Sequence, residues 1–309
     1  MTISRTIRVD APAPLLAALQ RAFTNHKRAT LKQYLKHRCI FVNGQAVTRH
    51  DYALAPGDEI RVEVDKKTRP DVTLASGLRI VYEDDAFMVV HKPPGMISVP
   101  DKVNRRDTAL DEVNAYLAAV PGDRRGRAHV VHRLDRHTSG LLLFARTAQA
   151  RAHFLDHWRE VEKRYLAVIE GSLEEESGVI RSHLAEDAAM KVRVVAEGEA
   201  SRLAITRFRV VKSNGRYSLV ECVLETGRKN QIRVHLAGLG HPVVGDLKYG
   251  SKKNPSGRLA LHAWRLSLRH PVTGKPLDCE SPFPESLARL LETESEKGPQ
   301  QKDRRTGRA

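Results

Sequence analysis

One short segment constrains the fold of this chain more than any other: a charged, turn-prone loop between two apolar runs. The apolar runs cover residues 130–131 and 141–145, and each is short enough to be a buried strand. The loop between them carries Asp135, flanked by Arg133 and Arg136. Positive charge beside a carboxylate favours its ionised form, which a nucleophile or a base requires. The same charges also fit a structural ion pair, so this pattern alone leaves both interpretations open.

The charge balance indicates a polyanionic partner. The chain has 309 residues, with 52 Lys and Arg against 37 Asp and Glu, a net charge of +15 and a pI near 9.9. Nucleic acid or an anionic membrane would attract such a chain. No apolar run approaches the ~20 residues of a membrane span, and residues 1–10 lack the apolar core of a signal peptide. We therefore favour nucleic acid over a membrane and expect a cytoplasmic protein.

The cysteines point to a reducing compartment. Cys39, Cys222 and Cys279 are far apart and form no Cys-x-x-Cys pair. The first two lie in apolar, strand-like stretches, where a small buried thiol is the ordinary state. The sequence therefore predicts no disulfide framework.

Residues 12–64 predict a compact unit of two short helices and a hairpin. A helical apolar face runs from Leu15 to Phe23, and a second helix is expected at about 30–37. Asn43-Gly44 predicts a type I′ hairpin turn, and Pro56-Gly57-Asp58 predicts another turn. Basic residues crowd the end of the second helix, among them Lys32, Lys36 and Arg38.

This arrangement resembles the S4-like RNA-binding domain, a small αL module first known from a ribosomal small-subunit protein. The resemblance implies that Lys32, Lys36 and Arg38 contact RNA phosphates. A solvated basic face is the alternative interpretation. We expect this domain over residues 1–64 and a polar linker over 65–77.

The remainder predicts one large domain and a tail. Hairpin signals and separated helices over residues 78–292 favour an α+β fold around a mainly antiparallel mixed sheet. Residues 293–309 are polar and basic, which predicts a disordered extension.

Four segments of the large domain follow the motif order of a known family. His132-Arg133-Leu134-Asp135, continuing through Thr138-Ser139-Gly140, resembles the catalytic motif of the RluA-type RNA pseudouridine synthases. Three further matches are Lys92-Pro93-Pro94-Gly95, the strand 163–171 and the segment 224–250. Together with the small domain, the resemblance covers nearly the whole chain and implies the pseudouridine synthase fold.

The resemblance implies a role for one or two residues of each motif. Asp135 would be catalytic and act at the sugar, while Arg133 would enter the space that the target base vacates. Tyr165 would pack against that base and act as the favoured general base, although a strand Tyr is ordinarily a packing residue. The remaining candidates are Arg233 as the partner of Asp135, Arg228 as the second choice, and Lys92 at the border of the cleft.

One departure from the family pattern concerns Lys229-Asn230, where the family usually has Thr-His. The Asp and Arg positions remain intact. No role of the family His can be transferred to this chain.

The expected function is isomerisation of uridine in structured RNA, with large-subunit ribosomal RNA favoured and tRNA as the alternative. A non-catalytic RNA-binding ribosome-assembly factor is the alternative of another class, and a basic DNA-binding regulator lacks a recognition-helix motif. The reaction is redox-neutral, and we expect no cofactor. We also expect no metal, because His153 and His157 have helical zinc spacing but no evident third ligand. We expect a monomer.

Overall fold

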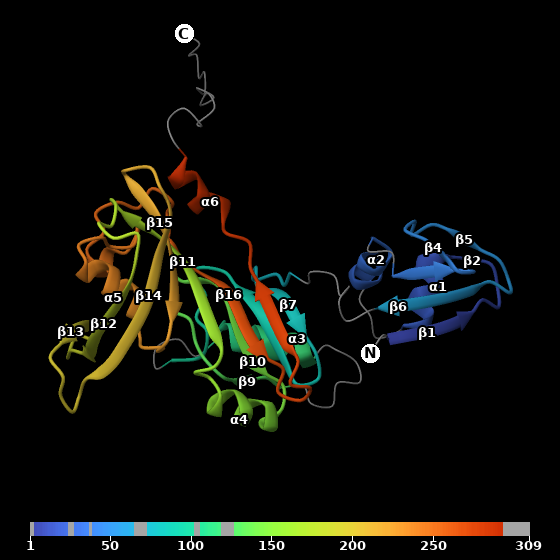
Figure 1. The fold of residues 1–309 in the computed structure, drawn as a ribbon. Helices are drawn as coiled ribbons and strands as arrows, with labels where there is room; N and C mark the ends of the chain where they lie inside the picture. Colours follow the sequence, from blue (N-terminus) through green and yellow to red (C-terminus); the bar gives the residue numbers. More distant parts are fainter. Residues whose placement is uncertain are drawn as a thin grey trace, which may run out of the picture. The chain divides into compact units, whose positions relative to one another are not determined.

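The computed structural model describes residues 3–23, 28–36, 39–64, 73–101, 106–118 and 127–292 (Figure 1). These residues belong to two compact units. Unit 1 takes its residues from Met1–Lys92, Ser98–Arg133 and Leu143–Leu155, and unit 2 from Pro93–Ile97, Leu134–Leu142 and Asp156–Ala309. The predicted domain boundaries at 64, 77 and 292 remain predictions. Residues 65–72 of the expected linker and all of the expected tail lie outside the described residues.

The N-terminal part of unit 1 contains a four-stranded sheet, ordered β1-β6-β3-β4, a two-stranded sheet and two helices. Their bounds are β1 Ile3–Arg8, β2 Ala13–Pro14, α1 Leu15–Ala22, α2 Arg28–Lys36, β3 Ile40–Val42, β4 Gln45–Ala46, β5 Ala53–Leu54 and β6 Glu59–Val64. Leu15 and Leu19 of α1 and Leu31 and Leu35 of α2 are buried in one apolar core. The predicted hairpin is confirmed, because residues 43 and 44 join β3 to β4 with φ of 50° and 81°.

The rest of unit 1 combines short strands with two helices. The elements are β7 Arg79–Glu83, β8 Phe87–Lys92, α3 Ala109–Ala118, β9 His129–Val130 and α4 Ala148–Asp156. The carboxylate of Asp84 accepts hydrogen bonds from the backbone nitrogens of Ala86 and Phe87, at 2.7 and 2.9 Å, which closes the turn between β7 and β8. At the described end of the predicted linker, Thr73 pairs with Arg79.

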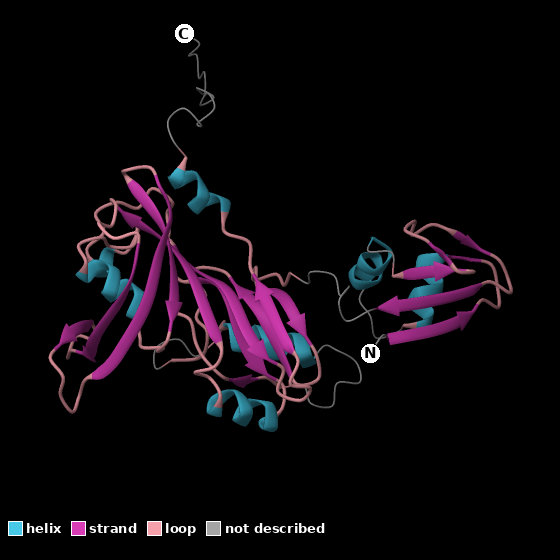
Figure 2. Ribbon diagram, in the orientation of Figure 1, coloured by secondary structure: helices cyan, strands magenta, loops and turns pink. Residues whose placement is uncertain are grey.

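Unit 2 contains the longest of the described strands, which are among those drawn in magenta in Figure 2. The strand order in this unit is β13-β12-β14-β15-β11-β16-β10, with β17 also paired to β16. The bounds are β10 Ser139–Ala145, β11 Glu162–Glu170, β12 Ser177–Glu186, β13 Val192–Val195, β14 Arg202–Ser213, β15 Tyr217–Leu224, β16 Leu261–Arg269 and β17 Pro276–Glu280. All these pairs are antiparallel except β10 with β16, where β10 continues into unit 1 after Leu142. The predicted α+β fold with a mainly antiparallel sheet is confirmed.

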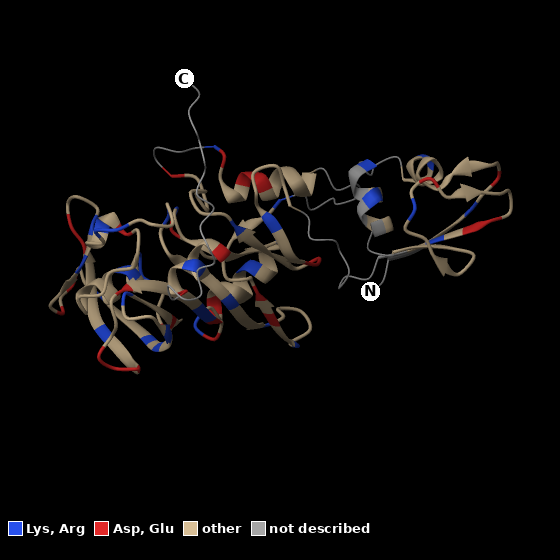
Figure 3. Cartoon of the chain, turned by 90° about the horizontal axis from the view of Figure 1, so that it is seen from above, with Lys and Arg blue, Asp and Glu red and all other residues tan. Residues whose placement is uncertain are grey.

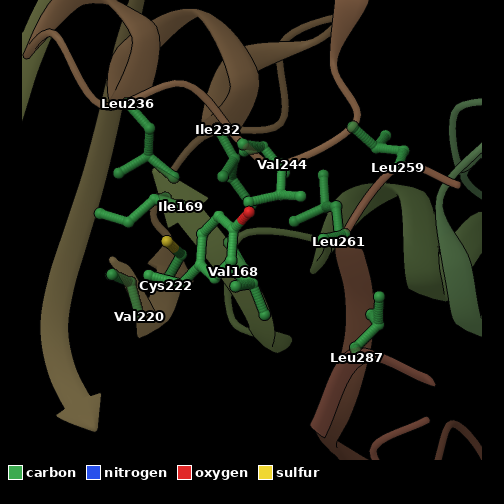
Figure 4. Packing of buried hydrophobic residues seen from close by; sticks show 14 of the residues in the cluster. Val168, Ile169, Val220, Cys222, Ile232, Leu236, Val244, Leu259, Leu261 and Leu287 are labelled. Atoms are coloured by element: carbon green, nitrogen blue, oxygen red, sulfur yellow. The ribbon is translucent and has the colours of Figure 1, made fainter. Parts of the chain in front are cut away.

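Helix α5, Gln231–Gly238, packs against the apolar face of this sheet. Ile232 and Leu236 point toward Val168, Ile169 and Cys222 (Figure 4). The helix ends at residue 238, and Leu239, which follows it, is 43% exposed. Three short helices complete the unit: η2 Leu247–Tyr249, α6 Glu285–Ala288 and η3 Arg289–Leu291.

Cross-strand ion pairs contribute to the same sheet, whose strands carry both signs of charge (Figure 3). Glu221 on β15 is buried and accepts hydrogen bonds from Arg164 at 2.8 Å and Arg209 at 2.7 Å. Burial disfavours the charge on Glu221, but the bonds from Arg209 and Arg164 outweigh it and lower the pKa of this carboxyl group. Removing one of these partners would leave a buried charge that is only partly compensated.

The three cysteines lie in described parts of the chain, where each is buried and outside any disulfide. Burial raises the pKa of Cys222 and of Cys279 to about 12, so neither is a reactive thiolate near neutral pH. Within the described ranges, no helix has both the length and the apolar composition that crossing a membrane requires.

Candidate active site

Asp135 lies in a tight loop just before β10. The backbone nitrogen of Thr138 donates to the carbonyl oxygen of Asp135 at 3.1 Å. Gly140 has φ +110°, and a Cβ there would overlap the backbone of Ala263, whose nitrogen would be 2.7 Å away. Only glycine allows β10 to approach β16 this closely. The Thr-Ser-Gly part of the motif therefore fixes where the loop of Asp135 joins the sheet.

Arg233 on α5 forms an ion pair with Asp135. Nη1 of Arg233 lies 3.2 Å from the carboxylate of Asp135, and Nε and Nη2 bind the two oxygens of Asp246 at 2.6 and 2.8 Å. The side chains are 11% exposed for Arg233, 26% for Asp135 and 1% for Asp246. Burial opposes the charge on Arg233, but Asp246 and then Asp135 outweigh it, so the pKa of Arg233 is raised.

Asn230 and Tyr249 support the same arginine. Oδ1 of Asn230 accepts a hydrogen bond from Nη1 of Arg233 at 3.0 Å, and Nδ2 donates to the hydroxyl of Tyr249 at 2.9 Å. The Arg233 guanidinium lies 5.0 Å from the centre of the Tyr249 ring. Asn230 has a left-handed backbone with φ 55°, which Asn adopts more readily than most residues. The departure from the family pattern thus places a bridging amide beside the ion pair.

Tyr165 on β11 faces the same region of the sheet. It pairs with Ala263, which in turn pairs with Gly140 at the start of β10. Burial raises the pKa of Tyr165 above its usual range, and the charge of Asp135 raises it further. The phenol is therefore neutral in the free site.

Asp135, Arg233 and Asp246, with Asn230 and Tyr249 beside them, are here called the ion-pair cluster. Two of the expected site residues, Arg228 and Lys92, do not belong to it. Arg228 is exposed, and its Nε donates to the carbonyl oxygen of Leu203 at 3.0 Å. Its backbone nitrogen donates to Gln231 at 3.0 Å, just before α5 begins. Lys92 is fully buried at the end of β8, so the RNA contact expected of it receives no support from the structure.

The other expected RNA-binding residues lie in unit 1. Arg133 is exposed two residues before Asp135, and Lys32 is exposed on α2. The side chain of Lys36 and the whole of Arg38 lie outside the described residues. Their roles remain predictions.

Reasoning from the sequence assigned no role to Asp246, Asn230 or Tyr249, which complete the ion-pair cluster. The signal for Asp246 was its place after Gly245, whose φ is +80°. A Cβ at Gly245 would come within 2.9 Å of the carbonyl carbon of Arg258. Such a glycine fixes the backbone beside Asp246. The sequence does not show, however, that the partner of Asp246 is Arg233.

The residues that the structure describes contain no group of three or more His, Cys, Asp and Glu side chains able to hold a metal ion. Helix α4 ends at Asp156, so His157 lies beyond the helix that carries His153.

The chain is similar to known proteins over most of its length. A family model described as RNA pseudouridylate synthase matches residues 86–238. The chain is 34% identical over 270 residues to the uncharacterized RNA pseudouridine synthase YlyB of Bacillus subtilis, covering 86% of this chain and 88% of that one. It is 36% identical over 292 residues to the ribosomal large subunit pseudouridine synthase D of Nitrosomonas europaea, covering 89% and 82%.

A solved structure supports the same assignment. Human RNA pseudouridylate synthase domain containing 1 superimposes with a TM-score of 0.55 at 27% identity, covering 69% of this chain and 86% of that one. The curated relatives match over most of their own length as well as most of this chain. The chain therefore belongs to the RNA pseudouridylate synthase family, and it is an RNA pseudouridine synthase of the RluA type.

Proposed function

We propose that this enzyme isomerises uridine in large-subunit ribosomal RNA and that Asp135 is its catalytic residue. One observation carries the assignment to Asp135: the two carboxylates that share Arg233 differ in access to solvent. Asp246 is 1% exposed, and both its oxygens are bound by the guanidinium. Asp135 is 26% exposed and accepts a single bond from Arg233. Only Asp135 can therefore present a free oxygen to a bound nucleotide.

The reaction requires few groups. The bond from nitrogen 1 of uracil to carbon 1′ of ribose breaks, and a bond from carbon 5 to carbon 1′ forms. Carbon 5 loses a proton and nitrogen 1 gains one, so the reaction is redox-neutral. Asp135 acts either by attacking carbon 1′ or by taking a proton from carbon 2′ to give a glycal. Both routes need a carboxylate within reach of the sugar, and the positively charged guanidinium of Arg233 lies 3.2 Å from the carboxylate of Asp135.

Tyr165 is proposed to pack against the target base and to remove the proton from carbon 5. Its place on β11, next to the strand that pairs with β10, supports contact with the base. The raised pKa of Tyr165 opposes proton removal in the free site. The role of general base therefore requires that bound RNA change the surroundings of the phenol.

Binding of RNA is proposed to use the basic residues outside the ion-pair cluster. Arg133 would fill the space left when the target base leaves its stack, a step that costs roughly a few kcal/mol. Lys32, Lys36 and Arg38 of the S4-like domain, proposed over residues 1–64, would contact phosphates. Arg228 is exposed beside α5 and would do the same.

The choice of ribosomal RNA rests on the name of the Nitrosomonas europaea relative, a synthase of the large ribosomal subunit. Mapping pseudouridines in ribosomal RNA and tRNA from cells with and without this gene tests the choice. We expect at least one pseudouridine to be lost from large-subunit ribosomal RNA. Losses confined to tRNA would overturn the proposed target. Full retention in both RNAs would favour the non-catalytic alternative.

A further inference from the structure

We propose that Lys191 and Lys248, here called the lysine pair, bind phosphates of the RNA strand that flanks the target nucleotide. Lys191 lies in the turn between β12 and β13, and Lys248 lies in η2. The proposal deepens the proposed function and rests on RNA being the substrate. It assigns a substrate-binding role to the turn that carries Lys191, which lies outside the four family motifs, and to Lys248, to which the fourth motif gave no role.

The ammonium groups of the lysine pair are not neutralised, although the carboxylate of Asp187, which binds Arg193, accepts a hydrogen bond from the backbone nitrogen of Lys191 at 2.9 Å. The two ammonium groups lie 5.5 and 5.8 Å from the centre of the same Tyr249 ring, and Lys248 donates to the carbonyl oxygen of Met190 at 3.1 Å. Within the part of the chain that the structure describes, neither ammonium forms an ion pair. Both charges therefore remain available to an anion.

Neighbouring cations are already neutralised. Arg193 binds Asp187 at 2.7 Å, and Lys229 binds Glu186. Of these four neighbouring cations, only the two of the lysine pair keep an unpaired charge, so a phosphate gains most there.

Tyr249 connects the lysine pair to the proposed catalytic residue. Its hydroxyl accepts hydrogen bonds from Asn230 at 2.9 Å and from the backbone nitrogen of Val192 at 3.2 Å. The ring also lies against Arg233, the partner of Asp135. A phosphate on the lysine pair would therefore lie on the strand that enters or leaves the active site.

The side chains beside the lysine pair fit a nucleotide. Leu247 is 73% exposed and Met190 is 64% exposed, each next in sequence to one of the two lysines. Single-stranded nucleic acid combines phosphates, which attract cations, with bases and sugars, which pack on apolar side chains. This combination favours RNA over an acidic protein segment as the occupant.

Salt dependence tests the proposal directly. Protein-free fragments of large-subunit ribosomal RNA are titrated with the full-length enzyme between about 0.05 and 0.4 M salt. For the variant Lys191→Gln/Lys248→Gln, the slope of log affinity against log salt should become shallower by about 1.4, since each phosphate contact on a single strand contributes about 0.7. The variant Lys253→Gln/Lys275→Gln removes two exposed charges elsewhere in unit 2 and should keep the wild-type slope.

Two outcomes overturn the proposal. One is a wild-type slope in the lysine-pair variant. A protein occupant would give this result, because binding to whole ribosomal subunits would then weaken while binding to free RNA would not. The other is an equal loss of slope in the control variant. Neither outcome affects the proposed function, which would fail separately if the wild type formed no pseudouridine in the same fragments.

Discussion

Arg233 donates two hydrogen bonds to Asp246, at 2.6 and 2.8 Å, and one to Asp135, at 3.2 Å. The arginine is thus anchored mainly by a buried carboxylate that cannot reach RNA. Asp135 receives positive charge without giving up both of its oxygens. This unequal sharing gives the loop carboxylate the freedom that a nucleophile or a base needs.

A substitution of Asp246 tests whether this residue holds Arg233 in place. Asp246→Asn takes away the charge and the two-pronged acceptor, and we expect the rate of pseudouridine formation to fall roughly 10²-fold because Arg233 is no longer held in place. Stability should also fall, since breaking a buried ion pair leaves an uncompensated charge. Rates are therefore measured well below the melting temperature. Asp278→Asn removes an exposed ion pair with Arg265 and should change neither property appreciably. A folded Asp246→Asn enzyme with the wild-type rate would refute the anchoring role.

The Thr-Ser-Gly turn should depend on its glycine. In Gly140→Ala the new methyl group meets the backbone of Ala263, and the residue keeps φ +110°. We expect the free energy of unfolding to fall by roughly 2–4 kcal/mol, as denaturant titration would measure. Gly215→Ala is the matched control, because Gly215 has φ +79° and nothing within 4 Å of its Cβ. It should lose only about 1–2 kcal/mol. Equal losses would show that the close approach of β10 to β16 is unimportant.

Much of this arrangement followed from the motifs, because they encode local geometry. The Asn43-Gly44 hairpin was expected from its residue types, and the contact between Asp135 and Arg233 was expected from the family resemblance. Asp246 was not assigned, because its bond to Arg233 depends on how the chain turns at Gly245. Lys92 was expected at the border of the cleft from the family resemblance, yet it ends a strand in which five of six residues are buried. Contacts that depend on how distant parts of the chain fold together cannot be predicted from such local patterns.

Acid should destabilise the protein partly through His235. Burial lowers the pKa of His235 from 6.5 to about 4, and the ring nitrogens contact the hydroxyls of Thr206 and Ser182. The unfolded chain binds a proton near pH 6.5, whereas the folded chain resists it down to about pH 4. Stability from this group is therefore complete above pH 6.5 and is lost as the pH falls toward 4.

The loss should reach about 3 kcal/mol in the wild type. His235→Gln cannot titrate in this range, so its free energy of unfolding should fall less between pH 6.5 and 4.5. Urea titrations of both proteins at several pH values provide the comparison. Parallel pH profiles would mean that the buried imidazole does not titrate as described.

Replacing Tyr165 separates its two proposed roles. Tyr165→Phe keeps the ring that packs against the base and removes the phenol oxygen, which would accept the proton in its ionised form. We expect RNA affinity to stay within about twofold, while the rate of product formation falls roughly 10²- to 10⁴-fold. Single-turnover assays at saturating RNA measure the rate without the contribution of binding. A near-wild-type rate would leave Tyr165 as a packing residue, in keeping with its raised pKa.

The central claim is that Asp135 performs the isomerisation, and release of tritium from RNA carrying 5-tritiated uridine tests it most directly. The substrate is total RNA from cells that lack the gene, so no choice of target is needed. The wild type should release tritium, and Asp135→Asn should release none above background while its RNA affinity and melting temperature stay close to those of the wild type. Equal release by the two proteins would contradict the assignment of Asp135.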